Sequence, residues 1–135
     1  MTAFRIHSLE HGRIVLAAAR AAGKAVVLVS PQASQMGVGW WRELVRLLSQ
    51  DFADVSFEAM LDCGPAAGLA LAGIRARVGP VRLNVDALTL AKIASIAEQA
   101  GTRAESGGAS LGGKDALDLL GVPDPASRCR EALGS

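Results

Sequence analysis

The sequence predicts an α/β fold, with a parallel sheet of about five strands and helices between them, in a single domain that covers residues 1–135. Short runs that are apolar throughout, such as 25–29, are typical of strands buried on both faces. Between them lie longer segments with the 3.6-residue apolar spacing of helices. Strand and helix repeat in units of roughly 25 to 30 residues, which fits both doubly wound sheets and (β/α)8 barrels.

The first strand and helix can be delimited closely. Residues 4–7 alternate in polarity like a short strand, and residues 9–22 have helical spacing, with Ser8 as the expected N-cap and Gly23 as the expected end. The same patterns predict further strands over 25–29, 56–61, 81–85 and 102–105, and further helices over 40–52, 66–78, 88–100, 116–120 and 126–133.

Turn residues mark the remaining boundaries. Asp86 is placed to cap the helix over 88–100, and Asp124-Pro125 is placed to open the last helix with proline in its first turn. The polar, small-residue segment 30–39 is predicted to be a loop, and the glycine-rich segment 106–114 a mobile loop. The second segment lacks the G-x-G-x-x-G pattern, so a dinucleotide site is not expected there.

Composition excludes several classes of function. The chain has 14 basic and 13 acidic residues, a net charge of +1 and no tyrosine, so it offers neither a basic field nor an aromatic surface for nucleic acid. Its apolar runs are too short to span a membrane, and its first residues lack the apolar segment of a signal peptide. Two cysteines without metal-site spacing fit reduced thiols. We therefore expect a cytoplasmic protein with no nucleic-acid or membrane partner.

The chemistry is expected at the end of the third strand, in the stretch Ser56 to Pro65. Asp62 and Cys63 follow the apolar run there, and functional groups of β/α proteins lie at the carboxyl ends of strands. Asp62 is the candidate acid or base; alternatively it caps the helix after Gly64 or binds loop amides. Cys63 is either a reactive thiol near a helix N-terminus or a buried, inert side chain.

Ser30 and Asn84 are the candidate substrate-binding residues. They stand at the ends of the second and fourth predicted strands, so they are expected to line one cleft with Asp62. The loop after Ser30 could hold a phosphate, although it matches no P-loop and also fits a surface loop. His7 and His11 are expected in a strand and in the following helix, and not as a metal-binding pair on one face.

The order of short motifs resembles the class II, metal-dependent fructose- and tagatose-bisphosphate aldolases. The matching segments are Phe4 to Glu10, Ser30-Pro31-Gln32-Ala33, Met60-Leu61-Asp62-Cys63-Gly64, Leu111-Gly112-Gly113 and Asp124-Pro125. The third segment is similar to the family's His-Leu-Asp-His-Gly, and the series corresponds to about the first half of such an aldolase. The resemblance implies a partial TIM-barrel-like fold and, at Asp62, the aspartate that transfers a proton.

Departures from the family decide the expected function. Cys63 stands where the family has a histidine that binds the catalytic metal, and the other two ligand histidines belong to the half that the resemblance does not cover. No metal ligand set and no cofactor are therefore expected; zinc would be the metal if an aldolase site were functional. We expect a non-catalytic, aldolase-like domain for assembly or small-ligand binding, with a phosphorylated sugar or another anion as the ligand.

The alternative is a small aldolase-like lyase that acts on phosphorylated sugars. In either case a homo-oligomer is expected, because a sheet cut from a barrel has two unpaired edges and an uncovered face. We favour a homodimer over a tail that folds across the sheet, since residues 116–133 carry few large apolar side chains.

Overall fold

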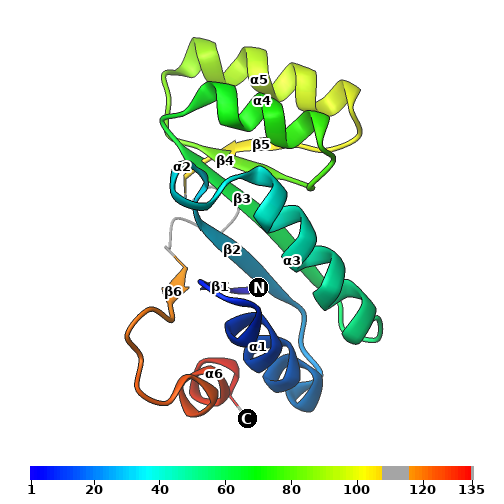
Figure 1. The fold of residues 1–135 in the computed structure, drawn as a ribbon, viewed down its shortest axis with the longest axis vertical. Coiled ribbons are helices and arrows are strands. Elements are labelled where there is room, and N and C mark those ends of the chain that lie inside the picture. Colours follow the sequence, from blue (N-terminus) through cyan, green and yellow to red (C-terminus); the bar gives the residue numbers. More distant parts are fainter. Residues whose placement is uncertain (108–115, 135) are drawn as a thin grey trace.

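The computed structural model describes residues 1–107 and 116–134, which form six strands and six helices (Figure 1). The elements in chain order are β1 (Thr2–Arg5), α1 (Leu9–Ala22), β2 (Val26–Gln32), α2 (Ala33–Met36), α3 (Val38–Asp51), β3 (Phe57–Gly64), α4 (Ala67–Arg75), β4 (Val81–Leu83), α5 (Ala87–Gln99), β5 (Ala104–Ser106), β6 (Leu117–Asp118) and α6 (Pro125–Leu133).

All six strands belong to one parallel sheet, in the order β5-β4-β3-β2-β1-β6. Strands that follow one another in the sequence are neighbours from β1 to β5, as short right-handed crossovers require. The predicted α/β class with a parallel sheet is confirmed. β5 and β6 stand at opposite ends of the strand order, so the arrangement matches part of a β/α barrel without showing a closed one.

The long helices form a row in the order α6, α1, α3, α4 and α5, in which each contacts the next (Figure 1). α6 packs against α1, and Leu119, Cys129 and Leu133 of the tail are buried in the main core. None of the helices in the described residues combines the length and the apolar character needed to cross a membrane.

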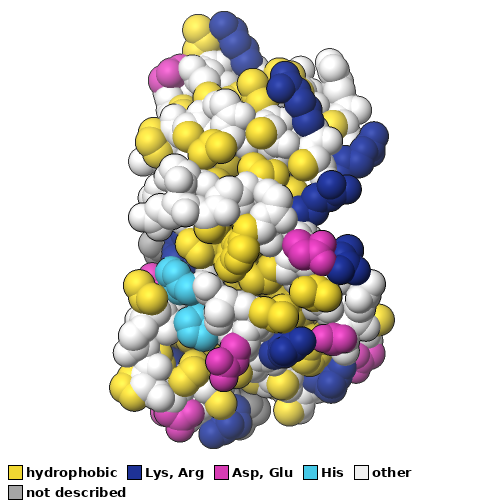
Figure 2. Space-filling model, in the orientation of Figure 1, with side chains coloured by type: hydrophobic (Ala, Val, Ile, Leu, Met, Phe, Trp, Pro, Cys, Tyr) yellow, Lys and Arg dark blue, Asp and Glu magenta, His cyan; other side chains and the backbone are white. Residues whose placement is uncertain are grey.

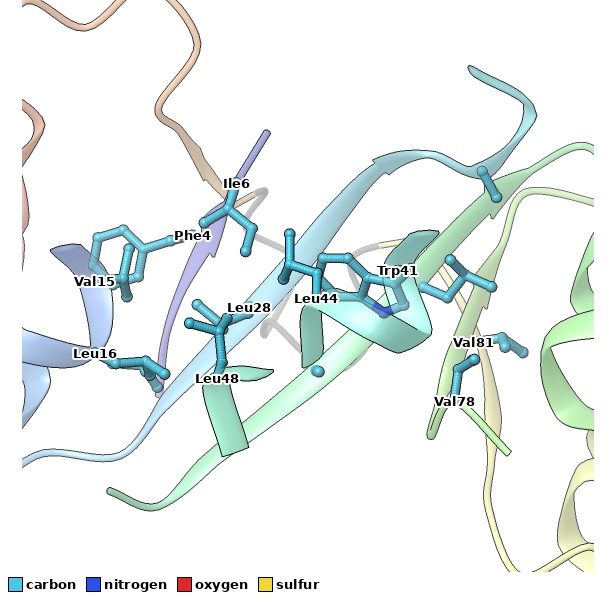
Figure 3. Close-up of a cluster of buried hydrophobic side chains, with 14 of the residues drawn as sticks. Phe4, Ile6, Val15, Leu16, Leu28, Trp41, Leu44, Leu48, Val78 and Val81 are labelled. Carbon is cyan, nitrogen blue, oxygen red and sulfur yellow. The ribbon is translucent and has the colours of Figure 1, made fainter. Parts of the chain in front are cut away.

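Alternate strand residues separate the two faces of the sheet. Phe4 and Leu28 point toward the helices and share the main core with Trp41 and other helix residues (Figure 3). Leu61 belongs to the same core. The opposite face holds a small cluster of Ala3, Val27, Val29 and Met60, all at most 8% exposed. The apolar residues expected to be uncovered on that face are therefore buried.

Several helices begin or end at the capping residues that the sequence predicted. The His11 amide donates to Ser8 Oγ at the start of α1, and Gly23 ends this helix with a φ of 64°. Asp86 accepts a hydrogen bond from the Thr89 amide at the start of α5. Asp124 accepts from the Ser127 amide at the start of α6, with Pro125 in the first turn.

Two predicted segments differ from the structure in type, and the first strand covers Thr2–Arg5 where residues 4–7 were expected. Residues 30–39 are not a loop, because β2 continues to Gln32 and the short α2 precedes α3. Residues 116–120 are not a helix, since Leu117 and Asp118 pair with Phe4 and Arg5 as the edge strand β6. The predicted mobile loop over 106–114 lies mostly outside the described residues, as do Leu111, Gly112 and Gly113.

Candidate functional site

Asp62 lies on β3 at the carboxyl edge of the sheet, on the face away from the helices, and is only 6% exposed. Its Oδ2 lies 2.9 Å from Arg5 Nη2 on β1, so this ion pair crosses over the intervening strand β2. Its Oδ1 accepts the Gly64 amide at 3.1 Å. Each oxygen of the proposed acid or base therefore has a partner within the sheet.

Ser30 joins the same cluster from β2. Its Oγ accepts the Asp62 amide at 2.8 Å and donates to the Pro31 carbonyl at 2.6 Å, while its own carbonyl accepts Arg5 Nη1 at 2.5 Å. Ser30 is fully buried. Its hydroxyl is thus used to link β2 to β3, and a ligand would have to displace these bonds to reach it.

Cys63 points to the opposite face of the sheet from Asp62. It belongs to the main core under the helices and is 1% exposed. Burial, with a further contribution from the Asp62 charge, raises the pKa of its thiol to about 12. The thiol is therefore protonated at neutral pH and faces core side chains, which fits the inert alternative and not a nucleophile.

Asn84 follows β4 at the same edge of the sheet, and its amide donates to the Gly64 carbonyl at 2.8 Å. The residue is exposed. Ser30 and Asp62 thus lie within the neighbouring strands β2 and β3 and are hydrogen-bonded, and Asn84 follows the next strand, β4. The described residues show no contact between the Asn84 side chain and either of them, so a shared cleft stays a prediction.

A histidine pair lies at the same edge, beside β6. His7 Nε2 is 2.6 Å from Asp118 Oδ1, and the His11 ring stands edge-on to the His7 ring with centroids 6.0 Å apart. Burial disfavours the ionised form of Asp118, but the Leu120 amide, His7 and Arg5 outweigh it and lower its pKa. The contact between His7 and Asp118 thus links β6 to the segment that follows β1.

His11 has its Nδ1 occupied by the backbone amide of His7 at 3.1 Å, which requires the Nε2-protonated tautomer when the ring is neutral. Burial, and then the neighbouring His7, lower the pKa of His11. The expectation that His7 lies in a strand is wrong, because β1 ends at Arg5. The chain reverses at Ser8 and brings the first turn of α1, with His11, back over the end of β1.

The residues at Asp62 and Cys63 do not fit a zinc site of the aldolase type. Zinc needs about three ligands that converge on one point, whereas these two side chains lie on opposite faces of the sheet. Within residues 1–107 and 116–134, no group of three or more His, Cys, Asp or Glu side chains is placed to hold a metal ion.

Arg5 and Asp118 were not among the candidates from the sequence. Arg5 could have been noticed as the polar residue between the inward Phe4 and Ile6, since alternation places it on the Asp62 face. Nothing near Asp118 signals a strand, because β6 has only two paired residues.

In comparisons with known proteins, no family model and no curated protein matches this chain.

Proposed function

We propose that this protein is a non-catalytic, aldolase-like β/α domain with a partial TIM-barrel-like architecture, which acts by assembly and not by chemistry. One observation carries the proposal: both oxygens of Asp62 are engaged by Arg5 and Gly64 in a site that is nearly closed to solvent. A general acid or base must reach the proton that it transfers. Here the carboxylate instead ties β3 to β1 across the intervening strand β2.

We expect no aldol cleavage of fructose 1,6-bisphosphate by the purified protein, with or without added Zn²⁺, in an assay for triose phosphate. Elemental analysis should find less than one zinc per chain. The matched variant is Asp62→Asn, which removes the charge and keeps the shape. One tightly bound zinc per chain, together with turnover that Asp62→Asn abolishes, would show that the domain is an enzyme.

The proposed assembly is a homodimer through the outer side of α5. This helix is at one end of the row, and among the described helices its main neighbour is α4. It exposes Leu88 and Ile96, at 68% and 45%, on one side of the helix. Large apolar side chains at helical spacing without cover are typical of association surfaces.

Light scattering at micromolar concentration should give twice the chain mass of 13.9 kDa. The double variant Leu88→Ser and Ile96→Ser should return the mass to one chain, because it removes the apolar contact and leaves the core side of α5 intact. Leu120→Ser is the control, since Leu120 is equally exposed but lies on the tail. A monomeric wild-type protein would refute the homodimer.

A second candidate function is a small lyase that acts on phosphorylated sugars without a metal. The observation that favours it is the His7–Asp118 pair at the carboxyl edge, because a carboxylate that orients an imidazole is a common arrangement for proton transfer. In the same triose phosphate assay, turnover without added metal that His7→Ala removes would favour the lyase. A thermal-shift series with phosphorylated sugars tests ligand binding at this edge.

A cytoplasmic location is part of the proposal. Both cysteines are free and buried, and burial raises the pKa of Cys129 to about 11, in addition to the shift at Cys63. Proteins in which cysteines serve as reduced core residues fit a reducing compartment.

A further inference from the structure

A groove separates α3 from α4 on the outer surface of the helix layer. Its walls are Arg42, Val45 and Arg46 of α3 and Arg77 and Val78 from the turn after α4, and it encloses about 580 Å³. Figure 2 shows the molecule indented between these helices, at the right of the view, with basic side chains beside the hollow. We call this hollow the α3–α4 groove.

The floor of the α3–α4 groove is apolar and continues beyond it. Val45 and Val78 also line an adjoining hollow of about 610 Å³, whose walls include Phe57, Ala59 and Pro80 at the amino end of the strands. A segment that lies in the groove would therefore have room to bury an apolar side chain against these residues.

The charge of the groove is unbalanced. Three arginines face one carboxylate, Glu43, which is already paired with Arg46. No carboxylate within the described parts of the chain forms an ion pair with Arg42 or Arg77. The surplus of positive charge beside an apolar floor is complementary to a segment that carries both carboxylates and an apolar side chain.

Arg77 occupies a backbone position that suits glycine better. Its φ of 56° is left-handed, and it is the one described residue other than glycine with a positive φ. A glycine just after a helix adopts this conformation without the steric penalty of a Cβ. The position thus presents a guanidinium to the groove at some cost to stability, which allows binding and folding to be tested separately.

We infer that the α3–α4 groove binds an acidic segment of a partner protein, with its carboxylates on Arg42 and Arg77 and an apolar side chain between Val45 and Val78. A helix laid into an apolar groove with charged banks is a common mode of recognition. Nucleic acid fits less well, because the basic part of the groove has no aromatic side chain for base stacking. The inference goes beyond the proposed homodimer, which uses α5.

The test uses the full chain and a fluorescein-labelled 16-residue peptide with leucines at helical spacing and glutamates beside them. Fluorescence anisotropy should show that the peptide binds and that its affinity falls about tenfold or more between 50 and 300 mM salt, because salt screens the attraction between exposed arginines and glutamates. The same peptide with lysine in place of glutamate, and a 16-nucleotide single-stranded RNA, should bind at least about tenfold more weakly.

Arg77→Gly and Arg42→Glu should each weaken peptide binding by about tenfold or more. The urea midpoint of Arg77→Gly should stay unchanged or rise, so that lost binding cannot be attributed to unfolding. Arg75→Ala is the control, because it removes an arginine of α4 that does not line the groove. Absence of binding by the wild type, unchanged binding by both groove variants, or preference for RNA would overturn the inference.

Discussion

Replacing Arg5 by alanine is expected to lower the free energy of unfolding by about 3–5 kcal/mol, the usual cost of leaving a buried charge without its partner. The Arg5 and Asp62 side chains are 15% and 9% exposed, so the variant leaves a carboxylate that is largely buried without its counter-charge. The Ser30 carbonyl loses a hydrogen bond in the same variant. Urea unfolding followed by circular dichroism measures the change.

Two further variants separate the charge from the packing. The double change Arg5→Met and Asp62→Leu should recover most of the loss, because apolar residues of similar volume often replace a buried ion pair at little cost. Arg13→Ala should cost less than about 1 kcal/mol, since its pair with Asp51 is 3.6 Å apart and half exposed. If Arg5→Ala unfolds at the wild-type urea midpoint, Asp62 is not the structural link that we describe.

The same face of the sheet carries a second charge bridge. Arg103, which precedes β5, pairs with both Glu58 on β3 and Glu105 on β5, so this link crosses over β4. Hydrogen bonding to Glu58, and also to Glu105, raises the pKa of Arg103 against the effect of its partial burial. The face that would line a barrel thus consists of a small apolar cluster between paired charges.

The first helix shows why much of the fold could be predicted from the sequence. Its signals are all local: the Ser8 cap, the apolar spacing and Gly23 at a position that requires a positive φ. The bounds of α1 therefore match the expectation of residues 9–22. The strand at 25–29 was found but ended early, because Ser30 and Pro31 read as loop residues although both are buried in the sheet.

The elements that were missed depend on distant partners. Leu117 and Asp118 form a strand only because the free edge of β1 accepts them, and a run this short has no periodicity that separates strand from helix. The same limit applies to the site. Asp62 was placed correctly at a strand end, but its partner Arg5 lies 57 positions earlier, and no local pattern pairs the two.

Trp41→Ala is expected to lower the free energy of unfolding by about 3–5 kcal/mol, as large-to-small changes of buried aromatic residues do. Trp41 is 0% exposed and lies in the main core with Leu44 of the same helix and Val81 of β4 (Figure 3). The cavity would open between α3 and the sheet, where the helix has few other large anchors. The urea midpoint, with an unchanged slope, measures the loss.

Trp41→Phe should cost far less, and the reason lies in the indole N–H. Trp41 Nε1 is buried without a hydrogen-bond partner in residues 1–107 and 116–134. A buried unsatisfied donor costs about 1–3 kcal/mol, and phenylalanine removes it while it keeps most of the aromatic packing. The smaller ring loses some packing, which destabilises the fold, while removal of the unsatisfied donor stabilises it. Because these two effects oppose each other, Trp41→Phe should stay within about 1 kcal/mol of the wild type.

Trp40→Phe is the matched control, since Trp40 is 38% exposed and should be nearly neutral. A large loss in Trp41→Phe would mean that the indole N–H has an acceptor, and that this donor stabilises the packing of α3 on the sheet.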